Sequence, residues 1–86
     1  MGKRITKRSK QFDKALKHIK DKSLKIKIWK QIEKINENPA IGDFLSYDLK
    51  GKRKIYIGSF RIIYIYDKKD NIIKFLDFDK RSKIYK

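Results

Sequence analysis

The spacing of apolar residues changes once along this chain, at the segment Asn38-Pro39-Ala40-Ile41-Gly42. Before this segment, apolar residues recur at the three- and four-residue intervals of one helix face. After it, they alternate with polar residues, which is typical of a strand with one buried face. Since 86 residues provide for a single hydrophobic core, we expect one domain over residues 1–86, with a helical half and a sheet half.

Two amphipathic helices are predicted before the change. Ser9 is a suitable N-cap for the first helix, and Asp21 or Ser23 begins the second. Asn36, Asn38 and Pro39 end the second helix. The apolar positions of the two helices are Phe12, Ala15, Leu16 and Ile19, then Leu24, Ile28, Ile32 and Ile35. The very short connection between the helices indicates an antiparallel αα-hairpin.

The second half predicts an antiparallel meander. Gly58-Ser59 is a two-residue connection of the kind that closes a tight hairpin. With the helices on one face of the sheet, the fold class is α+β. A short N-terminal strand from Arg4 to Lys7 is a further candidate element. The predicted strands of the meander are Phe44–Leu49, Lys54–Ile57, Phe60–Tyr66 and Ile72–Phe78.

The two faces of this sheet differ in chemistry. Helices must cover the more apolar face, which carries the predicted core residues Ile55, Ile57, Phe60, Ile62 and Tyr64. Lys54, Tyr56 and Arg61 then lie on the uncovered face, and Lys54 is expected opposite Arg61 across the hairpin. Cations for phosphate and a ring for a base are typical of a nucleic-acid interface.

The charge balance supports a polyanionic partner. Lys plus Arg number 25 and Asp plus Glu number 10, which gives a formal net charge of +15. Coding bias or adaptation to heat can enrich Lys and Ile together, but neither explains the deficit of acidic residues. We therefore expect nucleic acid or a ribonucleoprotein as partner. No apolar run approaches the ~20 residues of a membrane span, so a cytoplasmic location is expected.

The composition excludes several kinds of chemistry. The absence of Cys excludes disulfides and thiol nucleophiles, and a single histidine, His18, excludes a histidine metal cluster. Asp77 and Asp79 share one side of the last predicted strand. Because cations surround these two carboxylates, we expect ion pairs there rather than a metal site. Neither a metal nor a cofactor is predicted.

The remaining Lys, Arg and Tyr residues suit RNA cleavage by the ribose 2′-hydroxyl. Such a site must align the hydroxyl with the adjacent phosphate and stabilise the developing negative charge. Arg61 offers a planar fork of donors to a phosphate. A lysine such as Lys54 acts as a base where burial and positive neighbours lower its pKa. The alternative left open by composition is that these residues only solvate a basic protein.

Three stretches of the chain, in order, resemble the RelE/ParE toxin superfamily. These are Asp48-Leu49-Lys50-Gly51, Ile57-Gly58-Ser59-Phe60-Arg61-Ile62-Ile63-Tyr64 and Asp79-Lys80-Arg81-Ser82-Lys83-Ile84-Tyr85. The resemblance implies a toxin of a type II toxin–antitoxin pair, with a cognate acidic antitoxin as partner. RelE-like members cut mRNA in the ribosomal A site and leave a 2′,3′-cyclic phosphate. ParE-like members share the fold, inhibit DNA gyrase and lack the RNA-cutting residues.

The resemblance also implies roles for particular residues. Arg61 matches the arginine that contacts the scissile phosphate, and Lys54 falls where RelE has a lysine proposed for proton transfer. Arg81 and Tyr85 match the arginine and tyrosine of the closing motif, and the tyrosine positions the RNA base. The predicted catalytic set is therefore Lys54, Arg61, Arg81 and Tyr85. The predicted RNA-binding set is Lys50, Lys52, Arg53, Tyr56 and Lys80.

Two positions depart from the family pattern. Lys80 stands where many members have His, and Tyr56 stands where Arg or Lys is common. The leading interpretation is a RelE-like, metal-independent and ribosome-dependent endoribonuclease. The alternatives are a ParE-like gyrase inhibitor and a catalytically inactive, basic RNA-binding domain.

Overall fold

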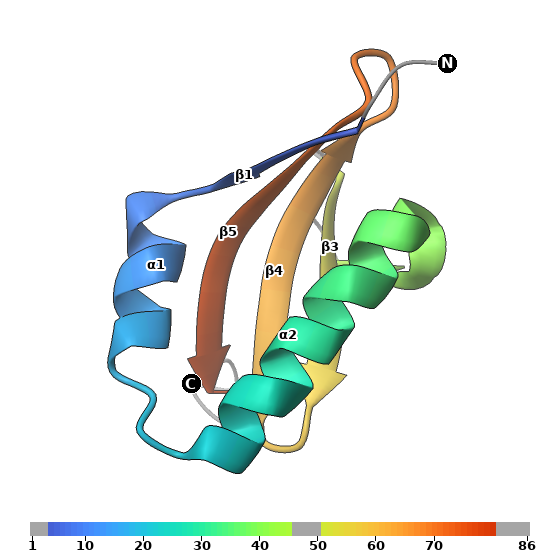
Figure 1. The fold of residues 1–86 in the computed structure, drawn as a ribbon. Coiled ribbons are helices and arrows are strands. Elements are labelled where there is room, and N and C mark those ends of the chain that lie inside the picture. Colours follow the sequence, from blue (N-terminus) through green and yellow to red (C-terminus); the bar gives the residue numbers. More distant parts are fainter. Residues whose placement is uncertain (1–3, 46–50, 81–86) are drawn as a thin grey trace.

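The structure is a computed structural model that describes residues 4–45 and 51–80. Two helices, α1 (Lys10–Lys17) and α2 (Lys22–Glu37), lie on one face of a five-stranded sheet (Figure 1). The strand order in the sheet is β1-β5-β4-β3-β2. The strands are β1 (Ile5–Arg8), β2 (Asp43–Phe44), β3 (Lys52–Ile57), β4 (Phe60–Asp67) and β5 (Ile72–Lys80). The α+β class, with both helices on one side, is confirmed.

Both helices begin where the sequence predicts. The Ser9 hydroxyl accepts a hydrogen bond from the Phe12 amide at 3.0 Å, and the Asp21 carboxylate accepts one from the Leu24 amide at 3.3 Å. These caps satisfy amides that have no partner within the helix. The helices diverge from their short connection: α1 packs against β5, whereas α2 crosses β4 and β3 (Figure 1). The predicted hairpin is therefore splayed across the sheet.

The antiparallel meander of β3, β4 and β5 is confirmed, and Gly58 takes a φ of 58° in the hairpin turn. The N-terminal strand differs from a purely antiparallel sheet, because β1 pairs with β5 in parallel, from Ile5 opposite Ile72 to Arg8 opposite Phe75. β1 thus pairs with the edge of β5 that β4 leaves free. β2 begins at Asp43 and ends at Phe44, and residues 46–49 of the predicted strand lie outside the described residues.

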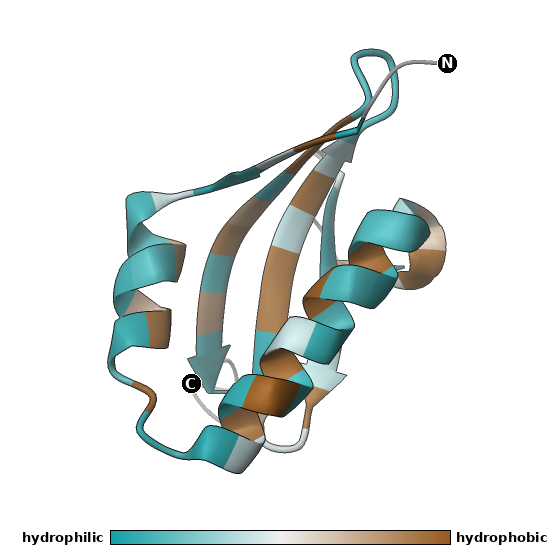
Figure 2. Ribbon diagram, viewed as in Figure 1, coloured by the Kyte–Doolittle hydropathy of each residue, from teal (hydrophilic) through white to brown (hydrophobic). Residues whose placement is uncertain are grey.

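The core lies between the helices and the sheet. Figure 2 shows hydrophobic bands on α2 and on the central strands. All five predicted core residues belong to it: Ile57, Ile62 and Tyr64 are buried, and Ile55 and Phe60 pack against them partly buried. The core contains two stacked aromatic pairs, with ring centroids 5.3 and 5.1 Å apart; the first joins α1 to the sheet, and the second joins two strands of the sheet. These pairs are Phe12 with Phe75 and Phe60 with Phe78.

A β-bulge between β4 and β5 allows two phenylalanines three residues apart to reach the same core. Tyr64 pairs with Phe75, but the preceding residue Ile63 pairs with Asp77, so Leu76 is the extra residue. In a regular strand, residues three apart point to opposite faces. The bulge resets this alternation, so that Phe75 and Phe78 are both buried and Asp77 turns to the uncovered face.

A buried tyrosine hydroxyl joins β4 to the turn that follows α2. The Tyr64 hydroxyl donates to the Pro39 carbonyl at 2.8 Å and accepts from the Gly42 amide at 2.9 Å. A Cβ at Gly42 would lie only 2.5 Å from that hydroxyl oxygen, so this close approach requires glycine. Burial raises the pKa of the Tyr64 hydroxyl above its ordinary value.

Replacing Tyr64 by Phe should lower the free energy of unfolding by about 1–3 kcal/mol, because the Gly42 amide and the Pro39 carbonyl lose their partner. Chemical denaturation measures this loss. The matched control is Tyr66→Phe, which removes one half-buried hydroxyl that donates to Asn71 at 2.9 Å. Equal losses in the two variants would contradict a special role for Tyr64.

Stability should also fall at alkaline pH through the same hydroxyl. Because the pKa of Tyr64 is raised in the folded state, its hydroxyl makes its full contribution to the free energy of unfolding below its ordinary pKa of 10.0. This contribution is lost as pH rises from 10.0 toward the folded-state pKa, because the unfolded chain ionises first. Denaturation of the wild type and of Tyr64→Phe at about pH 8 and about pH 11 should show a smaller difference at the higher pH. A constant difference would contradict the linkage.

Candidate nucleic-acid interface

The uncovered face of the sheet brings together cations from neighbouring strands. Lys54 and Tyr56 project from β3, and Arg61 projects from β4 on the same face. The expected pairing of Lys54 with Arg61 is wrong by two residues: Tyr56 lies opposite Arg61, and Lys54 lies opposite Ile63. Lys54 and Arg61 are therefore diagonal neighbours, a separation that long side chains span.

Lys54 is half-buried beside an aromatic ring. Its ammonium lies 5.4 Å from the ring centroid of Tyr56, within the range of a cation–π contact. The next pair along the hairpin is Tyr56 with Arg61. The Lys54 ammonium, the Tyr56 ring and the Arg61 guanidinium thus lie in sequence across two strands. Such a set can bind a phosphate and stack on a base at the same time.

Arg61 is held by one carboxylate. Its Nε donates to Asp79 Oδ1 at 3.0 Å, and the two side chains are 14% and 26% exposed. The expected ion pairing of Asp79 is thus confirmed, with Arg61 as its partner. Arg61 makes no further hydrogen bond to a described residue. A guanidinium held through Nε still has its two terminal nitrogens, which can donate in parallel to a phosphate.

Arg53 points to the other side of the sheet. It donates to the Gly42 carbonyl at 2.7 Å and to the Ala40 carbonyl at 3.3 Å. Its guanidinium carbon also lies 3.9 Å from the ring centroid of Phe44. These contacts tie β3 to the turn after α2, so the structure places Arg53 away from Lys54 and Arg61.

The remaining predicted residues fall into three groups. Lys52 lies on β3 opposite Ile65, on the same face as Lys54. Lys80 is opposite Phe60 on the helix-covered face, where it borders a hollow with residues of α1. Lys50, Arg81 and Tyr85, predicted for binding or catalysis, lie outside the described residues.

Two cations of the uncovered face were not predicted as site residues. Lys7 of β1 lies opposite Lys74 of β5, and both are exposed. Sequence reasoning missed this pair because the parallel contact joins the two ends of the chain. The sequence around Lys74 gives one local indication: Lys74 stands between Ile73 and Phe75, which are both buried, so the alternation of a strand places Lys74 on the face opposite the core.

The described residues offer little support for other kinds of site. Among residues 4–45 and 51–80, no three His, Cys, Asp or Glu side chains gather closely enough to hold a metal ion. Within the same ranges, neither helix combines the length and apolarity needed to cross a membrane. The chemistry of the uncovered face therefore rests on its lysines, arginine and tyrosine.

Comparison with known proteins identifies a family over nearly the whole chain. Residues 7–85 match the family model described as "ParE toxin of type II toxin-antitoxin system, parDE". A search of curated protein sequences finds no match.

Solved toxin structures share the fold. The intact RelBE toxin–antitoxin complex of E. coli matches with a TM-score of 0.77 and 14% identity, covering 90% of this chain and 95% of that chain. The archaeal RelE–RelB complex of Pyrococcus horikoshii OT3 matches with a TM-score of 0.75 and 24% identity, covering 95% and 99%. The YoeB dimer of Staphylococcus aureus matches with a TM-score of 0.75 and 26% identity, covering 91% and 97%.

Arg53→Ala should destabilise the fold by about 1–3 kcal/mol, because hydrogen bonds from a charged donor to the Ala40 and Gly42 carbonyls are lost. Thermal or chemical denaturation measures the change. Lys69→Ala, in an exposed turn, removes the same charge and should leave stability within about 0.5 kcal/mol. If both variants unfold like the wild type, Arg53 does not support the turn.

Proposed function

This chain belongs to the ParE toxin family within the RelE/ParE superfamily of type II toxin–antitoxin systems, and we propose that it is a ribosome-dependent endoribonuclease that cuts mRNA in the A site. The observation that carries the proposal is the placement of Lys54 and Arg61. They come from adjacent strands and lie as diagonal neighbours on the sheet face that no helix covers. Within residues 4–45 and 51–80 neither helix lies over this face, which leaves room there for an extended RNA strand.

The proposed reaction is an internal attack by a ribose 2′-hydroxyl. The 2′-oxygen forms a bond to the adjacent phosphorus while the bond from phosphorus to the 5′-oxygen breaks, which yields a 2′,3′-cyclic phosphate and a 5′-hydroxyl. The terminal nitrogens of Arg61, free of Asp79, stabilise the negative charge on the phosphate oxygens. Lys54 is the proposed base for the 2′-hydroxyl proton, and the leaving 5′-oxygen takes up a proton from water.

Further roles follow from the superfamily motifs. Arg81 is proposed to join Arg61 at the phosphate, and Tyr85 is proposed to orient the base. Lys50 and Lys52 would bind the RNA backbone. The ring of Tyr56, opposite Arg61, offers a stacking surface at a position where a cation is common in the superfamily.

Gyrase inhibition is the second candidate function, and two observations favour it. The matching family model is that of ParE toxins. In addition, Arg61 already pairs with Asp79, which lowers the net positive charge at the proposed phosphate position. In this alternative, the uncovered face binds a protein and cuts no RNA.

A cognate antitoxin is proposed as the partner in the cell. Some of the solved relatives are complexes of a RelE toxin with a RelB antitoxin. A net charge of +15 would draw a free toxin to RNA without discrimination, and an acidic segment wrapped around the toxin would neutralise that field.

Arg61→Ala should reduce mRNA scission in a translating extract by roughly a hundredfold or more, because a donor to the charged phosphate is lost. Primer extension on the translated mRNA detects the cuts. Lys30→Ala, on the exposed surface of α2, is the charge-matched control and should cut normally.

Two results would contradict the nuclease proposal. Unchanged scission by Arg61→Ala would remove Arg61 from the mechanism. Inhibition of gyrase supercoiling by the purified wild type, without any mRNA scission, would establish the alternative function instead.

A further inference from the structure

A second hollow lies on the uncovered face, at the end of the sheet away from Arg61. Its volume is about 580 Å³, and all five strands and the β4–β5 turn contribute residues to its lining. Lys7 and Lys74 line it together with the apolar side chains of Ile65 and Ile72. The hollow therefore combines an apolar floor with two ammonium groups.

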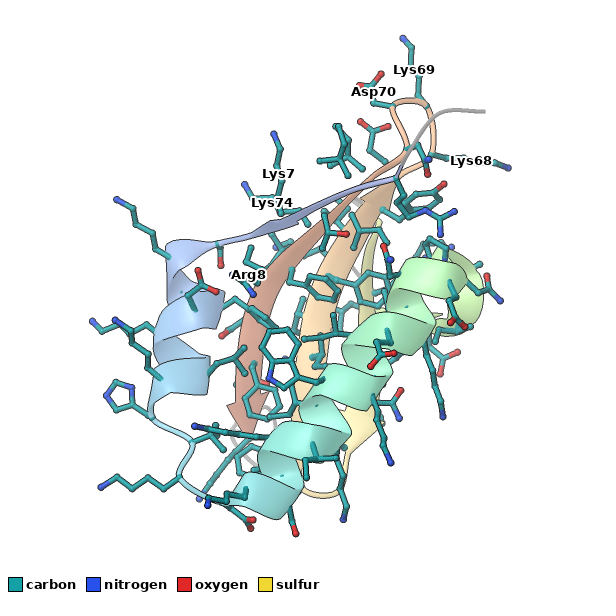
Figure 3. All side chains as sticks on the ribbon, in the orientation of Figure 1. Lys7, Arg8, Lys68, Lys69, Asp70 and Lys74 are labelled. Atoms are coloured by element: carbon teal, nitrogen blue, oxygen red, sulfur yellow. The ribbon has the colours of Figure 1, made fainter. Side chains whose placement is uncertain are left out.

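The lysine pair is electrostatically unfavourable in isolation. Lys7 and Lys74 are direct neighbours in the parallel ladder of β1 and β5, so their side chains leave the same face (Figure 3). Like charges directly opposite each other destabilise a sheet. No carboxylate of the described residues forms an ion pair with either lysine. An anion bound between the two ammonium groups would remove this repulsion.

The nearby acidic groups do not fill this role. Asp67 is the one carboxylate among the residues that line the hollow, and its Oδ1 accepts from the Asp70 amide at 3.2 Å within the β4–β5 turn. Figure 3 shows Lys68 and Lys69 projecting from the turn in other directions. Arg53 and Lys68 also line the hollow, but Arg53 donates to the Gly42 and Ala40 carbonyls and Lys68 lies in the β4–β5 turn. Lys7 and Lys74 are the two lining cations that lie directly opposite each other in the sheet.

We propose that Lys7 and Lys74 form a second phosphate subsite, which holds a backbone phosphate of the same RNA strand remote from the scissile one. This inference rests on the proposed function. Lys74 lies opposite Ile65, four residues along β4 from Arg61, so the two phosphate positions are separated by about 13 Å along the strand direction at ~3.3 Å per residue. The subsite binds RNA and takes no part in the chemical step.

The distribution of charge on the uncovered face favours the binding of an RNA strand along one direction. Lys52 lies opposite Ile65 and Lys54 lies opposite Ile63, so cations follow β3 between the two subsites. On the β5 side, Asp77 and Asp79 lie opposite Ile63 and Arg61 and repel phosphates. A polyanion therefore passes from the Lys7–Lys74 pair toward β3 and then to Arg61. An acidic peptide is the other class of ligand to test.

The test compares RNA binding by two double variants in an Arg61→Ala background, with 2′-O-methyl oligonucleotides that cannot be cut. Lys7→Gln/Lys74→Gln removes the subsite. Lys30→Gln/Lys34→Gln removes the same charge from exposed positions of α2 on the opposite layer. The ligands are a trinucleotide, too short to reach both subsites, and a dodecanucleotide.

The subsite variant should bind the dodecanucleotide more weakly than the control variant does. Its log–log salt slope should be shallower by about 0.7, the value for one lost phosphate contact on a single strand. Trinucleotide binding should be the same in both variants. The subsite variant should also unfold at the same or a higher temperature at low salt, because the like-charge repulsion is gone.

Three results would overturn the subsite. These are equal dodecanucleotide binding by the two double variants, equal loss for both oligonucleotide lengths, and weakened binding of a polyglutamate peptide with RNA binding unchanged. None of these results would contradict the proposed function, because mRNA scission by chains that retain Arg61 tests that function separately. Scission that requires Arg61, together with a failed subsite, would therefore remove only the subsite.

Discussion

The bulge at Leu76 is the constraint on which both the core and the uncovered face depend. It brings Phe75 and Phe78 into one core. Phe75 stacks on Phe12 of α1, and Phe78 stacks on Phe60 of β4, so β5 is attached both to a helix and to the neighbouring strand. The same shift in register places Asp79 opposite Arg61. A regular β5 would bury only one of the two phenylalanines, so packing and the position of the ion pair have a single cause.

Local patterns were sufficient to predict most of the fold. Ser9 and Asp21 cap the helices because their side chains bond the amides of residues three positions later, within the same stretch of chain. The core positions of β3 and β4 follow from a period of two. The parallel pairing of β1 with β5 was not predicted, because it depends on partners about 67 residues apart, beyond any local pattern.

The site was harder to predict for a related reason. Lys54 and Arg61 were placed on the correct face, since the hairpin that joins them is short, although their predicted register was wrong by two residues. Arg53 follows the same alternation, yet its role depends on carbonyls of the turn after α2, which composition does not reveal. Lys7 and Lys74 become neighbours only when the two ends of the chain meet.

The contact between the two ends of the chain has a consequence for synthesis. β1 is synthesised well before its backbone partners on β5, so this edge of the sheet forms only after β5 has been synthesised. Loop closure over such a span is slow compared with the folding of either helix. A nascent chain that has not yet reached β5 therefore lacks the neighbouring ammonium groups of Lys7 and Lys74, because these residues meet only in the ladder of β1 and β5.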